Sequence, residues 1–305
     1  MAIIEVANLY KNYGQVKAVQ GVSFSVQKGE IFGILGPNGA GKTTTLEILE
    51  GLRSADMGEV KIGGADVLRQ PQKVKQIIGV QLQSESFFDN LTLKELLELF
   101  GKIYQKKVAA YDLLQKVDLL EKAHTQHKTL SGGQQRRFSI AASLVNQPQV
   151  LFLDEPTTGL DPQARRYAWE LIKQIRQSGI TIVLTTHYME EAEYLCDRVA
   201  VMDHGKIVDI GAPFELIQTV FVKNHITFSS KKFIAHSDLE RLYGVTNVAK
   251  KENGTYHLET NDPEATLFKL LQESYDQNLG LYNLDLRRPN LEDVFIYLTG
   301  HKLRE

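Results

Sequence analysis

The segment EIFGILGPNGAGKTTTL, residues 30–46, decides the fold of this chain. Its apolar first part is typical of a buried strand, and its last residues are typical of a helix. Between them lies the pattern G-x-x-x-x-G-K-[ST], which ends in Lys42 and Thr43. Glycines let backbone N–H groups approach a phosphate chain, and the helix N-terminus adds a positive partial charge. The segment therefore predicts a phosphate-binding loop in which Lys42 reaches the terminal phosphates and the Thr43 hydroxyl binds Mg²⁺.

The composition is that of an ordinary globular protein. The chain has 305 residues, enough for a nucleotide-binding domain and a smaller one, with 43% hydrophobic and 24% charged residues. A net charge of −2 provides no field that attracts nucleic acid, so no nucleic-acid partner is expected. The single cysteine, Cys196, excludes an internal disulfide and fits a reducing compartment.

Neither end of the chain nor its interior has the pattern of a membrane segment. The N-terminal stretch MAIIEVANLYKNYG lacks a basic region before a long apolar core, so it is not expected to be a secretory signal. No stretch approaches the ~18 consecutive apolar residues that a membrane helix needs. Any membrane role is therefore expected to depend on a partner.

Strand patterns occur at the start of the chain and again in its second half. Residues 2–30 alternate in the manner of short antiparallel strands, with turns expected at Gly14 and Gly21. Two apolar runs, at residues 150–154 and 181–187, are typical of central parallel strands, and a helical pattern lies between them. This alternation predicts an α/β fold with a parallel sheet and N-terminal antiparallel strands.

Two other regions differ from this alternation. Residues 84–148 are rich in helical patterns and predict a helical insert, in which Thr92 is an N-cap. The residues after about 219 have the pattern of a small α+β unit without a glycine-rich loop. The sequence therefore predicts two domains, a nucleotide-binding domain over residues 1–219 and an accessory α+β domain over residues 220–305.

Two acids end the apolar run of residues 150–154. Asp154 and Glu155 are expected beside the phosphate loop, where Asp154 could hold Mg²⁺ through water and Glu155 could orient or deprotonate the attacking water. An acid pair at a helix N-terminus is the alternative.

A second loop-to-helix start lies at residues 131–134, SGGQ, with Ser131 placed as an N-cap. One nucleotide rarely needs two helix N-termini that are distant in sequence. The second start therefore suggests a phosphate bound between two chains, and a plain capped helix is the alternative.

Five motifs together resemble the ATPase subunits of ABC transporters. They are GPNGAGKT, LSGGQ at Leu130–Gln134, LFLDEP at Leu151–Pro156, GLD at Gly159–Asp161 and TTH at Thr185–His187. The segment THYMEEAEYLCDRVAVMDHGKI further resembles the ABC-2 export group, including its daunorubicin-resistance type. The segment PNLEDVFIYLTG is similar to a C-terminal extension of many such subunits. The resemblance implies the P-loop NTPase fold of the ABC ATPases.

The resemblance also implies a set of residues that bind ATP. The residues expected to contact the nucleotide in their own chain are Tyr13, Gly36, Asn38, Gly39, Ala40, Gly41, Lys42, Thr43 and Thr44. Tyr13 would stack on adenine, whereas the residue alone could equally cover the edge of a sheet. Ser131 and Gly133 would bind the γ-phosphate of ATP held by the other subunit, and Asp161 would lie across the dimer interface.

The remaining implied roles concern hydrolysis. Asp154 would serve Mg²⁺, Glu155 would be the general base, and His187 would contact the γ-phosphate and fix the water. Gln83 would touch Mg²⁺ or the water and would sense the membrane partner. Gln81 lies two residues earlier, and we favour Gln83 because the helical insert begins just after it.

The function implied is that of an ATP-hydrolysing subunit of a membrane exporter. Two such subunits, as a homodimer or with a paired ATPase subunit, would close head-to-tail over two Mg²⁺-ATP and drive a separate polytopic transmembrane subunit. The chain would lie in the cytoplasm on the inner face of the cell membrane. The alternatives are a soluble ABC ATPase that acts on ribosomes or nucleic acid, and a regulatory nucleotide switch. The expected features of ribosomal and DNA-repair relatives, a second cassette or a long coiled coil, are not in the sequence.

Three smaller groups of residues have open or modest interpretations. The resemblance implies that Phe87, Phe88 and Leu91 form part of a groove for a short helix of the membrane protein, whereas the residues alone could equally pack inside the insert. His124 and His127 have a spacing that suits a metal, but a solvated loop is the expectation because no second ligand pair is visible. Arg136 and its neighbour Arg137 are expected on the solvated side of their helix or near the interface, and not at nucleic acid.

Overall fold

The computed structural model describes residues 1–82, 87–219, 224–251, 254–287 and 289–300. The chain forms two compact units. Unit 1 is Met1–Glu215 together with Leu298–Glu305, and unit 2 is Leu216–Tyr297. None of the described helices is both long enough and apolar enough to cross a membrane.

A mainly parallel sheet of six strands forms the centre of unit 1, in the order β10-β9-β3-β8-β7-β6. Its strands are β3 (Ile31–Leu35), β6 (Ile78–Gln81), β7 (Val150–Asp154), β8 (Thr181–Thr186), β9 (Arg198–Asp203) and β10 (Lys206–Gly211). Only β10 pairs antiparallel, at one edge. Every residue of β3, β7 and β8 is buried, as expected of strands covered on both faces. The predicted α/β parallel-sheet fold is confirmed.

A second, antiparallel sheet has the order β2-β1-β4-β5. Its strands are β1 (Ala2–Tyr13), β2 (Val16–Gln27), β4 (Met57–Ile62) and β5 (Ala65–Asp66). The turn predicted at Gly21 is wrong, because this residue lies inside β2 with φ 73°. The register shifts there, since Leu9 pairs with Val22 but Tyr10 pairs with Gln20. Gly21 therefore forms a β-bulge, which requires the positive φ that glycine adopts readily.

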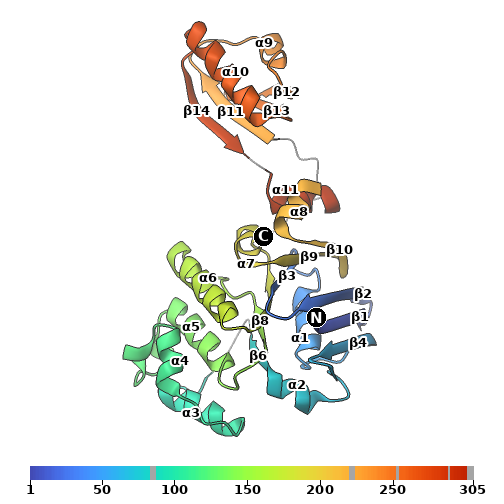
Figure 1. Cartoon of the computed structure of the whole chain (residues 1–305), viewed down its shortest axis with the longest axis vertical. Helices are drawn as coiled ribbons and strands as arrows, with labels where there is room; N and C mark the ends of the chain where they lie inside the picture. Colours follow the sequence, from blue (N-terminus) through green and yellow to red (C-terminus); the bar gives the residue numbers. More distant parts are fainter. Residues whose placement is uncertain (83–86, 220–223, 252–253, 288, 301–305) are drawn as a thin grey trace. The chain divides into compact units, whose positions relative to one another are not determined.

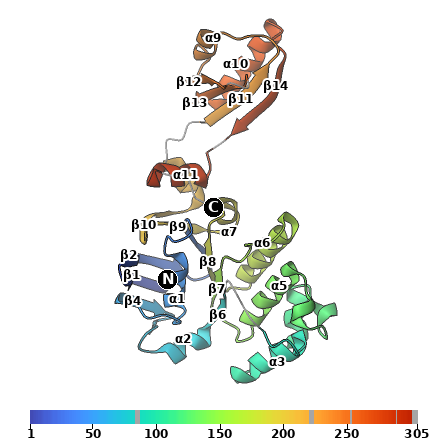
Figure 2. The ribbon, with the colours of Figure 1, turned by 180° about the vertical axis from the view of Figure 1, so that it is seen from behind.

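Helices of unit 1 connect and cover these sheets (Figures 1 and 2). They are α1 (Lys42–Leu49), α2 (Pro71–Ile77), α3 (Leu93–Ile103), α4 (Ala110–Lys116), α5 (Gly132–Ser143), α6 (Pro162–Gln177) and α7 (Met189–Leu195), with short 3-10 helices at Leu120–Lys122 and His127–Thr129. Helices α3, α4 and α5 gather on one side of unit 1 and form the helical insert (Figure 1). Thr92 caps α3 through a capping box with Glu95, as the sequence predicts.

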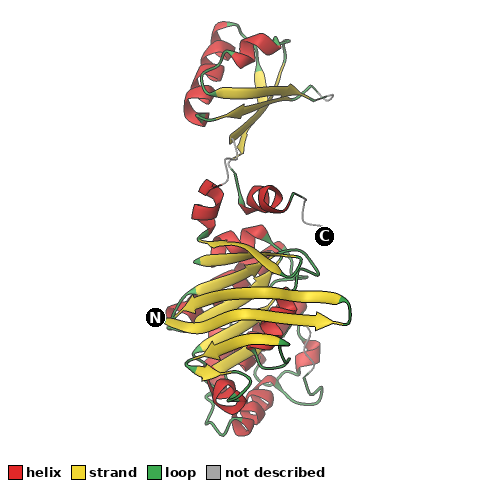
Figure 3. Cartoon of the chain, turned by 90° about the vertical axis from the view of Figure 1, so that its right-hand side faces the viewer, coloured by secondary structure: helices red, strands yellow, loops and turns green. Residues whose placement is uncertain are grey.

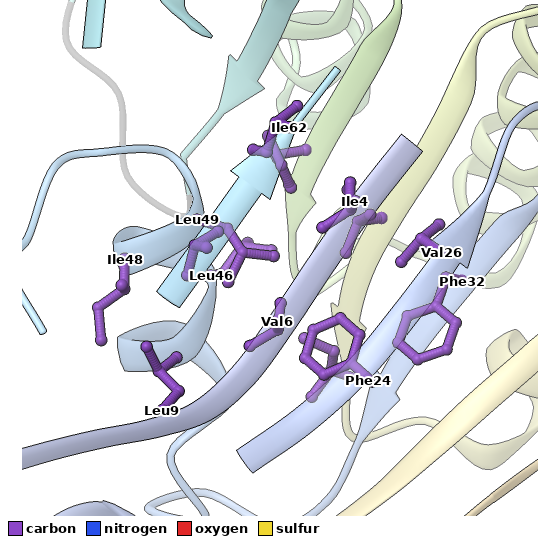
Figure 4. Close-up of a cluster of buried hydrophobic side chains, with 14 of the residues drawn as sticks. Ile4, Val6, Leu9, Phe24, Val26, Phe32, Leu46, Ile48, Leu49 and Ile62 are labelled. Carbon is purple, nitrogen blue, oxygen red and sulfur yellow. The ribbon is translucent and has the colours of Figure 1, made fainter. Parts of the chain in front are cut away.

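The core between the two sheets holds α1 in place (Figure 4). Leu46, Ile48 and Leu49 of this helix are buried among apolar side chains of both sheets. Phe24 of β2 stacks on Phe32 of β3, with ring centroids 5.0 Å apart. Because α1 directly follows the phosphate loop, this packing also fixes where that loop begins and ends.

Unit 2 combines helices with a sheet (Figure 3). The sheet is antiparallel, in the order β12-β13-β11-β14. Its elements are β11 (Asn224–Ser230), α9 (His236–Glu240), β12 (Val245–Lys250), β13 (Tyr256–Thr260), α10 (Pro263–Asp276) and β14 (Leu281–Arg287). Two further helices, α8 (Pro213–Thr219) and α11 (Leu291–Thr299), lie where the chain passes between the units. Unit 2 has its own core, in which the rings of Phe228 and Tyr256 stack at 5.3 Å.

Candidate functional site

The loop between β3 and α1 depends on glycines for two different reasons. Gly41 is the N-cap of α1 with φ 99°, and a Cβ there would lie 2.2 Å from the carbonyl oxygen of Ala18. A Cβ at Gly36 would lie 2.1 Å from the carbonyl oxygen of Met202. Gly39, with φ 83°, instead has nothing within 4 Å of the position of a Cβ. The backbone therefore packs closely on one side of the loop and leaves open space at Gly39, as a phosphate-binding loop requires.

A polar pocket of about 960 Å³ lies at this loop. It is lined by Tyr13, Gln15, Val16, Lys17, Ala18, Gln20, Asn38, Gly39, Gly41, Lys42, Thr43, Thr44, Glu155, Thr158, His187 and His204. Residues from both sheets thus meet around the N-terminus of α1. Tyr13 is part of this lining, and the Arg53 guanidinium lies 5.3 Å from the centroid of its ring.

Lys42 lies at the bottom of this pocket. Its side chain is 4% exposed, and Nζ donates to the carbonyl oxygens of Gly36 at 2.9 Å and Pro37 at 3.1 Å. Nζ also lies 3.5 Å from Oε1 of Glu155. Burial lowers the pKa of the Lys42 amine, although the charge of Glu155 opposes this. The loop therefore holds a nearly buried amine in the lining of the pocket.

Asp154 and Thr43 bring their oxygen atoms together next to Lys42. The Thr43 hydroxyl donates to Oδ1 of Asp154 at 3.3 Å. Burial raises the pKa of the Asp154 carboxyl, and a hydrogen bond from the Thr185 hydroxyl works against this rise. A hydroxyl and a carboxylate are the hard oxygen ligands that suit Mg²⁺, so this pair fits the metal that the sequence predicts.

Glu155 lies between Lys42 and His187. Its Oε1 is 3.2 Å from Nδ1 of His187, and its Oε2 accepts a hydrogen bond from the Thr158 hydroxyl at 3.0 Å. Burial opposes ionisation of Glu155, but the charges of Lys42 and His187 and the hydrogen bond from Thr158 together hold the pKa of its carboxyl below the ordinary value. The carboxylate is therefore ionised at neutral pH and able to accept a proton.

Thr185 is a site residue that the sequence reasoning missed. Its hydroxyl donates to Asp154 and accepts the backbone N–H of Glu155 at 3.0 Å. One side chain of β8 thus orients both acids at the end of β7. Its position in the motif TTH was visible in the sequence, but the role assigned to that motif concerned only His187.

Three residues expected at a subunit interface lie outside the pocket lining. Ser131 is the N-cap of α5 in a capping box with Gln134, and Asp161 is the N-cap of α6. Gly133, in the first turn of α5, has Ala164 of α6 as the nearest neighbour of a Cβ, at 3.3 Å. Ser131 and Asp161 therefore cap their own helices, and their roles toward a second chain remain predictions.

The predicted residue Gln83 lies outside the described residues. Gln81, the alternative to it, is fully buried at the end of β6. Ala40 and Gly36 are also buried and lie outside the pocket lining, and Gly36 directly follows β3 at the start of the loop.

The aromatic residues at the start of the insert have different environments. Phe87 packs on Phe100, His127 and Phe138, whereas Phe88 is 63% exposed. The solvated loop predicted for His127 is wrong, because its ring lies among these aromatic rings, and burial lowers its pKa. Among the described residues no group of three or more His, Cys, Asp or Glu side chains could hold a metal.

The two arginines after SGGQ also differ. Arg137 forms an ion pair with Asp118 and lies over the ring of Tyr167, near the surface as predicted. The solvated position predicted for Arg136 is wrong, because its guanidinium bonds inward to backbone carbonyls at the end of β7. The alternative, a position near the interface, stays a prediction. Sequence spacing gives the position of a helical residue, but not which neighbouring segment accepts its hydrogen bonds.

Together these features define the chain's class. A glycine-rich loop leads from a buried parallel strand into a helix, a buried lysine lies in that loop, and two acids end a neighbouring strand. This is the arrangement of the P-loop NTPases.

Comparisons with known proteins show to which family of P-loop NTPases the chain is similar. The family model described as ABC transporter matches residues 19–158. The chain is 36% identical over 315 residues to the linearmycin resistance ATP-binding protein LnrL of Bacillus subtilis, covering 99% of this chain and 100% of the relative. It is 38% identical over 309 residues to the Nod factor export ATP-binding protein I of Ralstonia nicotianae, covering 99% and 95%.

A solved structure agrees with these relatives. A dimeric ATP-binding cassette in a post-hydrolysis state with ADP and phosphate superposes with a TM-score of 0.62 at 27% identity, covering 68% of this chain and 98% of that one. The chain belongs to the ABC transporter family, as its ATP-binding and ATP-hydrolysing subunit.

Proposed function

We propose that this chain powers a membrane exporter by closing head-to-tail on a second ATPase subunit, with two ATP molecules between them. The observation that carries the proposal is that two anion-binding groups of one chain, the loop at Lys42 and the N-terminus of α5, do not line the same pocket. The pocket at Lys42 has no residue of α5 in its lining, yet α5 begins with a capped N-terminus at Ser131. A second subunit would supply that N-terminus to the phosphates held at Lys42.

The residues around the pocket have different roles in ATP hydrolysis. Lys42 and the loop N–H groups hold the phosphates, and Tyr13 offers a ring on which adenine can stack. Glu155 accepts a proton from the attacking water as it adds to the γ-phosphorus, and His187 orients that water. The products are ADP and inorganic phosphate. Loss of the γ-phosphate removes the group shared by both subunits, and the dimer opens.

Thr43 and Asp154 would hold Mg²⁺, with Gln83 as a further ligand from outside the described residues. When bound, the metal would neutralise charge that develops on the phosphate oxygens. Asp154 is itself oriented by Thr185 and lies at the end of a fully buried strand, so this ligand is held rigidly.

The transport partner is proposed to be a separate polytopic transmembrane subunit. The chain would then lie in the cytoplasm at the inner face of the membrane. The linearmycin resistance and Nod factor export relatives support an export function. Purification of the chain from membranes should yield a polytopic protein in a fixed ratio. Stable association with ribosomes or DNA, without any membrane protein, would instead favour a soluble ABC ATPase.

Replacing Lys42 by Ala is expected to weaken ATP binding by about 100-fold, because charge-assisted hydrogen bonds from a desolvated ammonium are lost. Titration with a fluorescent ATP analogue measures the change. Lys28→Ala, at an exposed lysine outside the pocket, is the matched control and should bind like the wild type. Equal affinities of the Lys42 variant and the control would remove Lys42 from the phosphate site.

A further inference from the structure

Arg136 joins three parts of unit 1 through one side chain. It lies on α5, and its Nε donates to the carbonyl oxygen of Pro156 at 2.7 Å. Its Nη2 donates to the carbonyl oxygens of Asp154 at 3.3 Å and of Glu155. Its Nη1 donates to the carbonyl oxygen of Leu82, just after β6, at 3.2 Å. All four of these acceptors are backbone carbonyls, so these hydrogen bonds fix the path of the main chain.

The main chain at this place is unusual. Glu155 has φ 46°, in the left-handed region that is unfavourable for a residue with a Cβ. Such a conformation persists only where neighbouring groups impose it. Here Arg136 binds the carbonyl of the residue itself and the carbonyls on both sides of it. The Glu155 N–H is held in turn by the Thr185 hydroxyl at 3.0 Å.

This backbone turn decides where the Glu155 carboxylate lies. The side chain leaves the end of β7 and reaches the space between Lys42 and His187, 3.5 Å and 3.2 Å from their nitrogens. With φ in the ordinary helical or extended regions, Cβ would leave the backbone in a different direction. The position of the carboxylate is therefore coupled to the contacts that hold the turn.

We propose that Arg136 is a positioning residue for ATP hydrolysis, which holds the backbone of Glu155 in its left-handed turn and so places the carboxylate beside Lys42 and His187. The proposal rests on the proposed role of Glu155 as the general base. Arginine suits the task because its planar guanidinium carries five N–H donors in a fixed fork, whereas lysine has one nitrogen. Arg136 does not line the pocket, so it acts through Glu155 and not on the nucleotide.

The test compares Arg136→Met, Arg136→Lys and Arg137→Met in the full chain, by the kcat and KM of ATP hydrolysis and by ATP affinity. Arg136→Met should lower kcat by about 10- to 100-fold, since a general base contributes about 10²- to 10⁴-fold and is misplaced rather than removed. ATP affinity should stay within about threefold, because the phosphate loop keeps its contacts. Arg136→Lys should recover part of kcat. Arg137→Met, which removes a surface ion pair on the same helix, should behave as the wild type.

The kcat and the ATP affinity of these variants decide whether Arg136 positions Glu155. A wild-type kcat in Arg136→Met overturns the proposal, as does an equal loss of kcat and of ATP affinity. If Arg136→Met does not fold, Arg136→Lys carries the test, and a wild-type kcat in that variant overturns the proposal. Glu155→Gln, measured in the same assay, distinguishes a failure of the base assignment from a failure of the role of Arg136. Retained turnover in Glu155→Gln defeats the base assignment itself, whereas an inactive Glu155→Gln with a fully active Arg136→Met defeats only the role of Arg136.

Discussion

Replacing Glu155 by Gln is expected to lower kcat for ATP hydrolysis by about 10³-fold, equivalent to about 4 kcal/mol of transition-state stabilisation. An amide keeps the size of the side chain and can still accept from Thr158, but it has no affinity for the proton of the attacking water. ATP affinity should change little, because the contacts of the phosphate loop remain. Steady-state phosphate release and equilibrium ATP binding, measured on the same protein, separate these two quantities.

The matched control for this prediction is Glu190→Gln, which neutralises an exposed carboxylate at the start of α7. It should hydrolyse ATP at the wild-type rate. Turnover in Glu155→Gln that equals this control would show that another group takes the proton.

Replacing Glu50 by Gln is expected to stabilise the folded protein at neutral pH by up to roughly 3 kcal/mol. Glu50 follows α1, is 2% exposed, and its Oε1 has no hydrogen-bond partner among the described residues. Burial, with the nearby charges of Asp154 and Glu47, raises its pKa from 4.5 to about 9. The carboxyl is therefore protonated in the folded protein at pH 7 and ionised in the unfolded chain.

The pH dependence follows from the direction of this shift. The folded state holds a proton that the unfolded state releases, so the wild type loses stability as pH rises from about 4.5 toward about 9. Glu50→Gln removes this loss, and the two proteins should be equally stable near pH 5 and diverge by pH 8. Urea unfolding at both pH values measures the gap. Glu59→Gln, at an exposed carboxylate of β4 that does not act on Glu50, is the control and should change stability by less than about 1 kcal/mol.

If the free energies of unfolding of wild type and Glu50→Gln differ by the same amount at pH 5 and pH 8, the Glu50 carboxyl titrates normally. In that case the groups around the end of α1 would have to solvate its charge.

Local patterns were enough to predict much of this protein. The phosphate loop could be read directly, because its glycines, lysine and threonine are consecutive and each has a role set by its own backbone or side chain. The capping of α3 by Thr92 was predictable for the same reason. The parallel sheet followed from the two apolar runs at residues 150–154 and 181–187, which form β7 and β8.

Features that depend on pairing between distant segments were not predictable in this way. Gly21 was expected in a turn, but the register between β1 and β2 makes it a bulge within one long strand. Thr185 orients two acids only because β8 lies beside β7. Arg136 turns inward because the end of β7 offers carbonyls to α5. In each case the residue type was visible, while its partner was set by the tertiary fold.

We propose that ATP held at Lys42 is hydrolysed only when Ser131 of another chain closes over it. The most direct measurement is the mass of the Glu155→Gln protein by light scattering, with and without Mg²⁺-ATP. We expect ATP to double the mass, and we expect the addition of Ser131→Arg to this variant to abolish the doubling while each chain still binds ATP. A mass that doubles equally well with Ser131→Arg, or ATP bound at full occupancy without any change in mass, would contradict the account.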